Sequence, residues 1–174
     1  AISWFQAQQA CLLSGKRLPT NAEWQGAAAG TVDPGESNGA DGSCNTTLGT
    51  VRVTGGGTQC FSRYDVEDAV GNLAEWTNAW GQFGPVDTDY DWATTSQPWP
   101  AGFAANDGAN TLDTTPNVNG VARSYASLFT GLPAAVVRGG TFYGGTSAGL
   151  FAYSGNLSPA EVLPEVGFRC ARSR

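Results

Sequence analysis

Hydrophobic and polar positions along the chain predict two short helices near its start. Ser3, followed three positions later by Gln, forms a capping-box pattern, in which each side chain satisfies a free amide at the helix start. Apolar residues then recur at helical spacing until Gly15, a residue type that commonly ends helices. Thr20, followed by Glu at the same distance, predicts a second helix that ends before Gly30.

Beyond these helices the pattern changes to turns and short apolar runs. Runs at 135–138 and 167–171 predict strands. Residues 81–134 have little periodicity and predict a long, aromatic-bearing loop insertion, which is uncommon in compact domains and points to function. No internal repeat or linker divides the chain, so we expect one α+β domain over residues 1–174. Because it opens directly at the lead-in to a helix, we also expect it to be part of a longer protein.

Composition narrows the classes of partner. A net charge of −6 without a basic cluster argues against nucleic acid, and no apolar run is long enough for membrane insertion. The acidity fits either solubility or cation binding. The sequence has no His, which excludes His-ligated metals, Ser-His-Asp hydrolysis and a His general base.

Four cysteines without a Cys-X-X-Cys pair make zinc or thioredoxin chemistry a poor fit. Two disulfides fit better and predict an oxidising location: extracellular, on a cell surface or on a virion. Three pairings are possible by count alone. The alternative is a reduced cytosolic chain with four buried thiols.

Four blocks, in the same order, resemble the formylglycine-generating-enzyme (sulfatase-modifying factor) family. The blocks are residues 15–24, 71–76, 137–142 and 167–171. The resemblance implies a C-type-lectin-like fold with two short helices, a small twisted antiparallel sheet and much irregular structure. The strand that such families carry before the first helix is missing, which again predicts an N-terminally truncated chain.

The resemblance also implies a pairing for the cysteines. In the family, a Cys on the first helix bonds the Cys of the terminal block, which corresponds to Cys11 and Cys170 here. That leaves Cys44 and Cys60 to close a Gly-rich loop.

The family's oxidase chemistry is not expected. Its two catalytic cysteines correspond to Gly144 and Gly149, so no thiolate is present to bind copper. Related iron enzymes need a His set that the sequence lacks. We therefore expect no catalytic residues, no copper and no iron.

A calcium site is implied by the block around residue 71. The carried-over ligands are the side chains of Asp68 and Glu75 and the carbonyls of Gly71 and Leu73. The alternative is a structural turn in which Glu75 pairs with an Arg and Asn72 bonds the backbone.

Residues 138–170, hereafter the variable segment, resemble the variable regions of diversity-generating-retroelement target proteins, except that Thr141 and Phe142 stand where those have Ser and Trp. The matching frame positions are Arg138, Gly139, Gly140, Ala148, Gly149, Phe151, Pro159, Gly167 and Phe168. The resemblance implies a ligand-binding face formed by Tyr143, Gly144, Ser147, Tyr153, Ser154, Asn156, Leu157, Ala160, Glu161, Leu163 and Glu165.

The residue types agree with that interpretation. Tyr, Ser, Gly and Asn dominate antibody paratopes, because Tyr offers contact area at low entropic cost and Ser and Asn offer adaptable hydrogen bonds. The plain alternative is an ordinary polar surface loop. Of the six Trp residues, those at 4, 24 and 76 fit a core, whereas Trp80, Trp92 and Trp99 fall at or within the insertion and fit the rim of a site.

The expected function is therefore a non-catalytic receptor- or adhesion-type domain that binds a protein or glycan on another cell or particle surface. The resemblance implies a viral or prokaryotic source. The alternatives are a structural remnant of a formylglycine-generating-type enzyme within a larger assembly, and an active oxidase or hydrolase with an unrecognised site.

Overall fold

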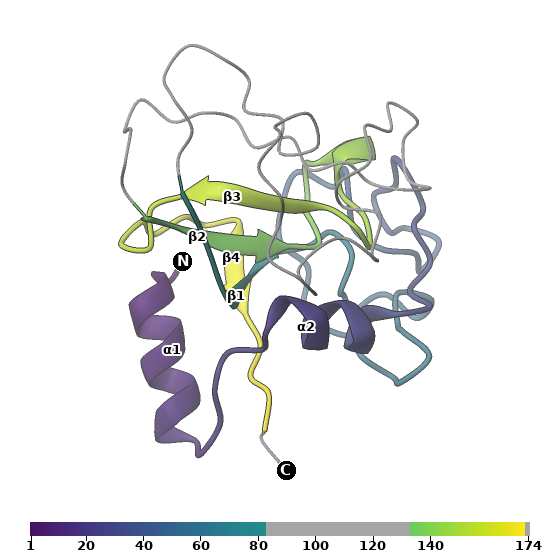
Figure 1. Cartoon of the computed structure of the whole chain (residues 1–174). Coiled ribbons are helices and arrows are strands. Elements are labelled where there is room, and N and C mark those ends of the chain that lie inside the picture. The colour runs from purple at the N-terminus through teal and green to yellow at the C-terminus, as the bar shows by residue number, and fades with distance from the viewer. Residues whose placement is uncertain (83–132, 173–174) are drawn as a thin grey trace, which may run out of the picture.

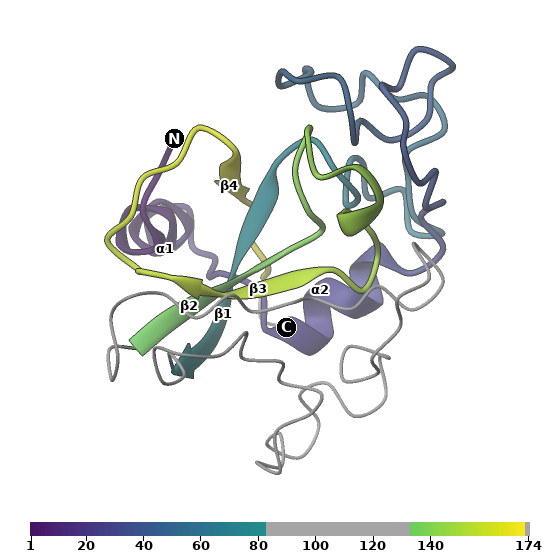
Figure 2. The same cartoon turned by 90° about the horizontal axis from the view of Figure 1, so that it is seen from above.

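The computed structural model describes residues 1–82 and 133–172, which form two helices and a four-stranded sheet (Figure 1). The helices are α1 (Trp4–Leu13) and α2 (Asn21–Ala28), followed by strands β1 (Ala74–Gln82) and β2 (Pro133–Arg138). A 3-10 turn, η1 (Gly145–Ser147), precedes β3 (Tyr153–Leu157) and β4 (Val166–Phe168). The long segment between α2 and β1 is irregular and is held by turns and hydrogen bonds (Figure 2).

Both predicted helices are confirmed, including their capping boxes. The Ser3 hydroxyl accepts a hydrogen bond from the Gln6 amide while the Gln6 side chain accepts from the Ser3 amide. Thr20 and Glu23 make the same reciprocal pair at the start of α2. These bonds satisfy amides that have no partner within the helix.

The sheet has the order β3-β2-β1-β4. β1 pairs antiparallel with β2, and β2 with β3, but β1 pairs in parallel with β4. The expected α+β fold is confirmed, but the sheet, expected to be antiparallel, is mixed because of the β1–β4 pair. Parallel pairing becomes possible because the chain from β3 turns back past α1 before it enters the sheet at the far edge of β1 (Figure 2).

The main core lies between α1 and the sheet. Trp4, Ala7 and Cys11 on α1 pack against Trp76 of β1 and against neighbouring apolar residues of β2 and β4. Burial of the tryptophans at 4, 24 and 76 confirms the prediction that they belong to the core. Trp80 is 42% exposed, whereas Trp92 and Trp99, with the insertion from residue 83 onward, lie outside the described residues.

Two disulfides cross-link the described part of the chain. Cys11 bonds Cys170 and so joins α1 to the segment after β4, and Cys44 bonds Cys60 within the irregular region. These are the pairs that the family resemblance implies. In the parts of the chain that the structure describes, no helix has the length and apolar character needed to span a bilayer.

Candidate functional site

The variable segment leaves the sheet at the end of β2 and returns to it at β4. Its first turn is fixed by main-chain bonds, because the carbonyl of Gly139 accepts from the amides of Gly71 (3.0 Å) and Gly149 (3.1 Å). Gly140 has φ of 80°, and a Cβ there would lie 2.4 Å from the Cα of Ala148. Only glycine fits such a close approach with a left-handed backbone.

Arg138 anchors the start of the segment inside the protein. Its side chain is fully buried, and its guanidinium lies 5.0 Å from the ring centroid of Trp24. It donates to the carbonyls of Phe151 and Leu150 (3.4 Å each) and to the side-chain oxygen of Gln25. This frame residue therefore ties the segment to α2.

The structure places the predicted ligand-binding residues at three depths. The exposed ones are Tyr143, Ser147, Ala160 and Glu161. The half-buried ones are Gly144, Ser154, Leu157, Leu163 and Glu165. Tyr153 is buried, and the side chain of Asn156 lies outside the described part of the structure. The outer part of the set is formed by the turn around η1 and the loop between β3 and β4.

Tyr143 and Glu165 connect the two ends of this set. Tyr143 is 56% exposed, and its hydroxyl donates to Oε1 of Glu165 over 2.7 Å. Partial burial, and then the neighbouring Glu165 carboxylate, raise the pKa of Tyr143 to about 12. The phenol therefore stays neutral at physiological pH and presents an uncharged ring to solvent.

Three residues expected on the ligand-binding face make packing contacts inside the protein. Tyr153 is only 6% exposed, and its ring centroid lies 6.0 Å from the guanidinium carbon of Arg138. Leu157 and Leu163 pack against the main core. The expectation that Tyr153 is displayed is thus corrected: β3 turns this side chain inward, onto the anchoring arginine.

The positions of the family's catalytic cysteines are occupied differently here. A Cβ at Gly149 would lie 2.5 Å from Oδ2 of Asp33, so the Asp33 carboxylate fills the space that a side chain there would need. At Gly144 the nearest atoms to a Cβ are 3.3 Å away. All four cysteines of the sequence are in disulfides. No thiolate is therefore present in this arrangement to bind copper or to act as a nucleophile.

Burial affects the Asp33 carboxyl itself. It raises the pKa of Asp33 to about 6, although the hydrogen bond from the Gly35 amide (3.1 Å) acts in the opposite direction. The group has no thiol or imidazole beside it, because the sequence holds no His and no free Cys.

The first carboxylate of the expected calcium set, Asp68, is bound within the protein. It is 4% exposed, and its Oδ1 lies 3.0 Å from a guanidinium nitrogen of Arg52. Its Oδ2 accepts from the amide of Gly55 over 2.8 Å. Both oxygens therefore have partners.

The second carboxylate, Glu75, is held by Arg169 of the terminal block. Both Glu75 oxygens accept from this guanidinium, and Oε2 also accepts from the indole nitrogen of Trp24 over 2.7 Å. Burial acts to lower the pKa of Arg169, but the charges of Glu75 and Asp68 raise it above its ordinary value. Arg169 thus lies in the field of both carboxylates.

The remaining two members of that set, Gly71 and Leu73, lie in the turn that leads into β1. As placed, the set does not fit a calcium ion, because Arg52 and Arg169 already occupy its carboxylates. Among the described residues, no three His, Cys, Asp or Glu side chains gather closely enough to hold a metal. Calcium binding by this set, which the family resemblance implies, would require both arginines to move away.

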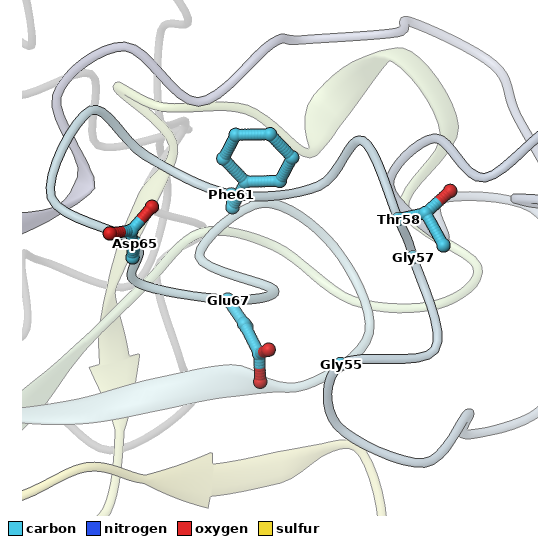
Figure 3. Close-up of a pocket in the computed structure, with 6 residues that line it drawn as sticks. All are labelled: Gly55, Gly57, Thr58, Phe61, Asp65 and Glu67. Atoms are coloured by element: carbon cyan, nitrogen blue, oxygen red, sulfur yellow. The ribbon is translucent and has the colours of Figure 1, made fainter.

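A pocket of about 200 Å³ opens outside the variable segment (Figure 3). It is lined by Gly55, Gly57, Thr58, Phe61, Asp65 and Glu67. The Phe61 ring stands between Asp65 and Thr58 (Figure 3). No residue of the expected sites lines it.

Sequence reasoning missed one stretch beside the variable segment, residues 46–53, hereafter the fixed loop. The amide of Gly49 donates to the carbonyl of Phe142 (3.1 Å), and the amide of Gly145 donates to the carbonyl of Thr46 (2.9 Å). The only signal in the sequence is three apolar residues, Leu48, Val51 and Val53, within a stretch of small and polar ones.

Comparison with known proteins agrees with the fold. A family described as "Sulfatase-modifying factor enzyme 1-like domain" matches residues 1–174. No curated protein matches the chain at the sequence level.

Several solved structures are similar to this chain. The P3c, M1 and U1 variants of "Major Tropism Determinant" align with TM-scores of 0.57, 0.56 and 0.56 and identities of 21%, 25% and 24%. Each alignment covers 97% of this chain but 36% of the other, so the chain spans about a third of the length of these proteins.

Proposed function

We propose, from the premise that the chain belongs to the family of sulfatase-modifying factor enzyme 1-like domains, that it is a ligand-binding member without the family's oxidase chemistry. One observation carries this proposal: the segment that corresponds to the oxidase site holds no thiol or imidazole. Asp33 fills the space at Gly149, and all cysteines are in disulfides.

The exposed side chains of the same segment support a binding role. Tyr143 and Ser147 lie on the turn around η1, and Ala160 and Glu161 lie on the loop before β4. A neutral Tyr with small polar neighbours is the composition of an antibody paratope. The face proposed for ligand contact is therefore this outer part of the variable segment.

The similar structures support the diversified character of that face. Their name describes determinants of tropism, and several variants of the same protein are represented. By analogy, this domain selects a protein or glycan on another cell or particle surface, and a retroelement rewrites the variable segment. An extracellular, cell-surface or virion location fits the two disulfides, and the negative net charge disfavours nucleic acid.

We further propose that residues 1–174 act as one domain. The main core joins α1 to the sheet, and the Cys11–Cys170 disulfide links α1 to the segment after β4. The competing function is that of a structural remnant of an enzyme. It is favoured because Asp68 pairs with Arg52 and Glu75 pairs with Arg169 inside the protein. A structural remnant would show no concentration of codon changes at the exposed positions.

The gene tests the proposal. We expect a near-copy of the codons for the variable segment beside a reverse-transcriptase gene, with differences confined to codons of the ligand-binding residues. Related genomes should differ at Tyr143 and Ser147 while they keep Arg138 and Gly140. No template copy, together with differences spread evenly over the segment, would reject diversification and favour the remnant.

A further inference from the structure

The fixed loop adjoins the exposed turn of the variable segment. The two main-chain bonds from Gly49 to Phe142 and from Gly145 to Thr46 place Leu48 beside the backbone that carries Tyr143. The fixed loop lies outside the variable segment in sequence, yet it borders the same surface.

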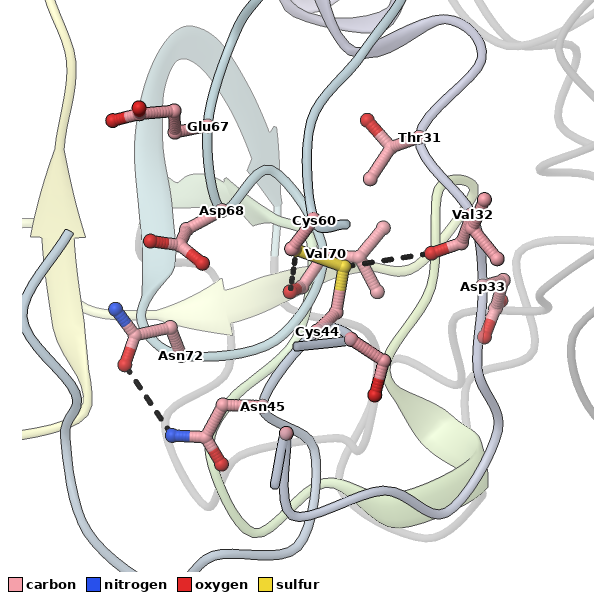
Figure 4. Close-up of a disulfide and its surroundings, with 12 residues drawn as sticks. Thr31, Val32, Asp33, Cys44, Asn45, Cys60, Glu67, Asp68, Val70 and Asn72 are labelled. Atoms are coloured by element: carbon pink, nitrogen blue, oxygen red, sulfur yellow. Dashed lines mark hydrogen bonds between the residues drawn. A yellow bond between two sulfur atoms is a disulfide. The ribbon is translucent and has the colours of Figure 1, made fainter. Parts of the chain in front are cut away.

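Two buried asparagine side chains, Asn45 and Asn72, hold the fixed loop by hydrogen bonds. Asn45 is fully buried, its Nδ2 donates to the carbonyl of Thr50 (3.0 Å), and its Oδ1 accepts from the amide of Leu48 (3.1 Å). The Oδ1 of Asn72 accepts from Nδ2 of Asn45 over 3.4 Å (Figure 4). The same oxygen accepts from the amide of Arg52 over 2.8 Å. The Cys44–Cys60 disulfide (Figure 4) closes a covalent loop that contains residues 46–53.

This hydrogen-bonded loop presents apolar side chains to solvent. Leu48, Val51 and Val53 are 42%, 45% and 83% exposed, and none belongs to a core cluster of the described residues. Tyr143, which follows the Phe142 that Gly49 bonds, is also exposed, at 56%. A group of exposed apolar side chains on a preorganised loop is typical of interaction sites, because ordering it costs little on binding.

The charged side chains of residues 139–168, which adjoin the fixed loop, are all carboxylates. Residues 139–168 contain Glu161 and Glu165 but no Lys or Arg. The carboxylate of Glu36 lies 3.6 Å from where a Cβ of Gly145 would be. The one cation of the fixed loop, Arg52, is turned inward to Asp68, and its side chain is 14% exposed. The surface therefore combines apolar groups with carboxylates and offers no exposed cation of its own.

We propose, as an extension of the proposed function, that the fixed loop and Tyr143 form one surface for a protein partner whose contact area combines apolar side chains with Lys or Arg. The fixed loop supplies apolar contact that does not change, and the variable segment supplies selectivity. Charge complementarity favours a basic protein over a neutral glycan.

The probe is a short synthetic peptide of alternating Leu and Lys, compared with its Leu and Glu counterpart and with a neutral oligosaccharide. Fluorescence anisotropy gives the affinity, and amide shifts of labelled protein locate the contact. The paired variant is Leu48→Ser with Val51→Ser. The matched control is Leu13→Ser, because Leu13 is 80% exposed on α1, on the other side of the molecule (Figures 1 and 2).

We expect the Leu and Lys peptide to bind, and binding to weaken about tenfold in the loop variant and in Tyr143→Ala, as for residues central to an interface. Leu13→Ser should leave binding unchanged. Equal loss in Leu13→Ser, equal binding of the Leu and Glu peptide, or preferential binding of the oligosaccharide would overturn the inference.

The same variants distinguish a failure of this inference from a failure of the proposed function on which it rests. If Tyr143→Ala weakens binding and the loop variant does not, the inference fails while the proposed function stands. If neither variant weakens binding, the inference fails, and the gene comparison alone decides the proposed function. Melting temperatures of all variants report whether they are folded.

Discussion

The hydroxyl of Tyr143 donates to Glu165 over 2.7 Å and so joins the turn around η1 to the residue before β4. The bond bridges two loops rather than two strands. It therefore holds the two loops of the ligand-binding face together, independently of the hydrogen bonds of the sheet.

This bond predicts an unusual titration. In a difference titration by ultraviolet absorbance between the wild type and Tyr143→Phe, we expect the missing phenol to ionise at a pKa of about 12. Glu165→Gln should lower that pKa only partly, since burial is the larger cause. A midpoint near the ordinary value of 10 would show that Tyr143 is neither partly buried nor bonded to Glu165 in solution.

The two disulfides should contribute unequally to stability. Their bonded cysteines are 159 and 16 positions apart, so loop entropy predicts about 5 kcal/mol for Cys11–Cys170 and about 3 kcal/mol for Cys44–Cys60 as upper values. Denaturant unfolding of the two paired Cys→Ser variants measures both. The reverse order would mean that the loop-length argument does not govern this fold.

Loss of the Arg169 side chain should destabilise the fold. Arg169→Gln leaves the Glu75 carboxylate buried without its cation, and we expect a loss of about 3 kcal/mol in unfolding free energy. Arg17→Gln is the matched control, because Arg17 and Glu23 form an exposed pair. A similar small effect in both variants would argue against a buried Glu75–Arg169 pair.

A calcium chelator should leave the melting temperature unchanged. Arg52 and Arg169 already neutralise Asp68 and Glu75, so both carboxylates of the expected calcium set have a cation. The experiment compares melting in excess EGTA and in excess calcium. A clear rise in melting temperature with calcium would show that the arginines give way to the ion, as the family resemblance implies.

Asp33 predicts a stability change with pH. Its pKa is about 6 in the fold and 3.8 ordinarily, so its contribution to stability is fully present below 3.8 and is lost as pH rises through about 6. We expect Asp33→Asn, relative to the wild type, to be more stabilising near neutral pH than near pH ~4. Thermal melts at both pH values test this, and a difference independent of pH would contradict it.

The sequence predicted the helices well, because capping is local. Ser3 with Gln6 and Thr20 with Glu23 determine where α1 and α2 begin, whatever packs on them. The β2 strand was also foreseen, with its start two residues later than observed.

Features that depend on distant partners were not foreseen. β1 has Thr77 as its one β-branched residue, so its strand conformation depends on β2 and β4. The inward turn of Tyr153 depends on where Arg138 lies, which no local pattern records. The fixed loop was missed because its position beside Phe142 follows from the fold of Asn45 and Asn72 beneath it.

The main-chain bonds at the base of the variable segment have a consequence for evolution. Gly139 accepts from two amides, and Gly145 donates to Thr46, so these anchors do not depend on the side chains displayed above them. Replacing Tyr143 or Ser147 removes none of them. The domain can therefore accumulate substitutions on its outer face, across many generations, without a change in its backbone conformation.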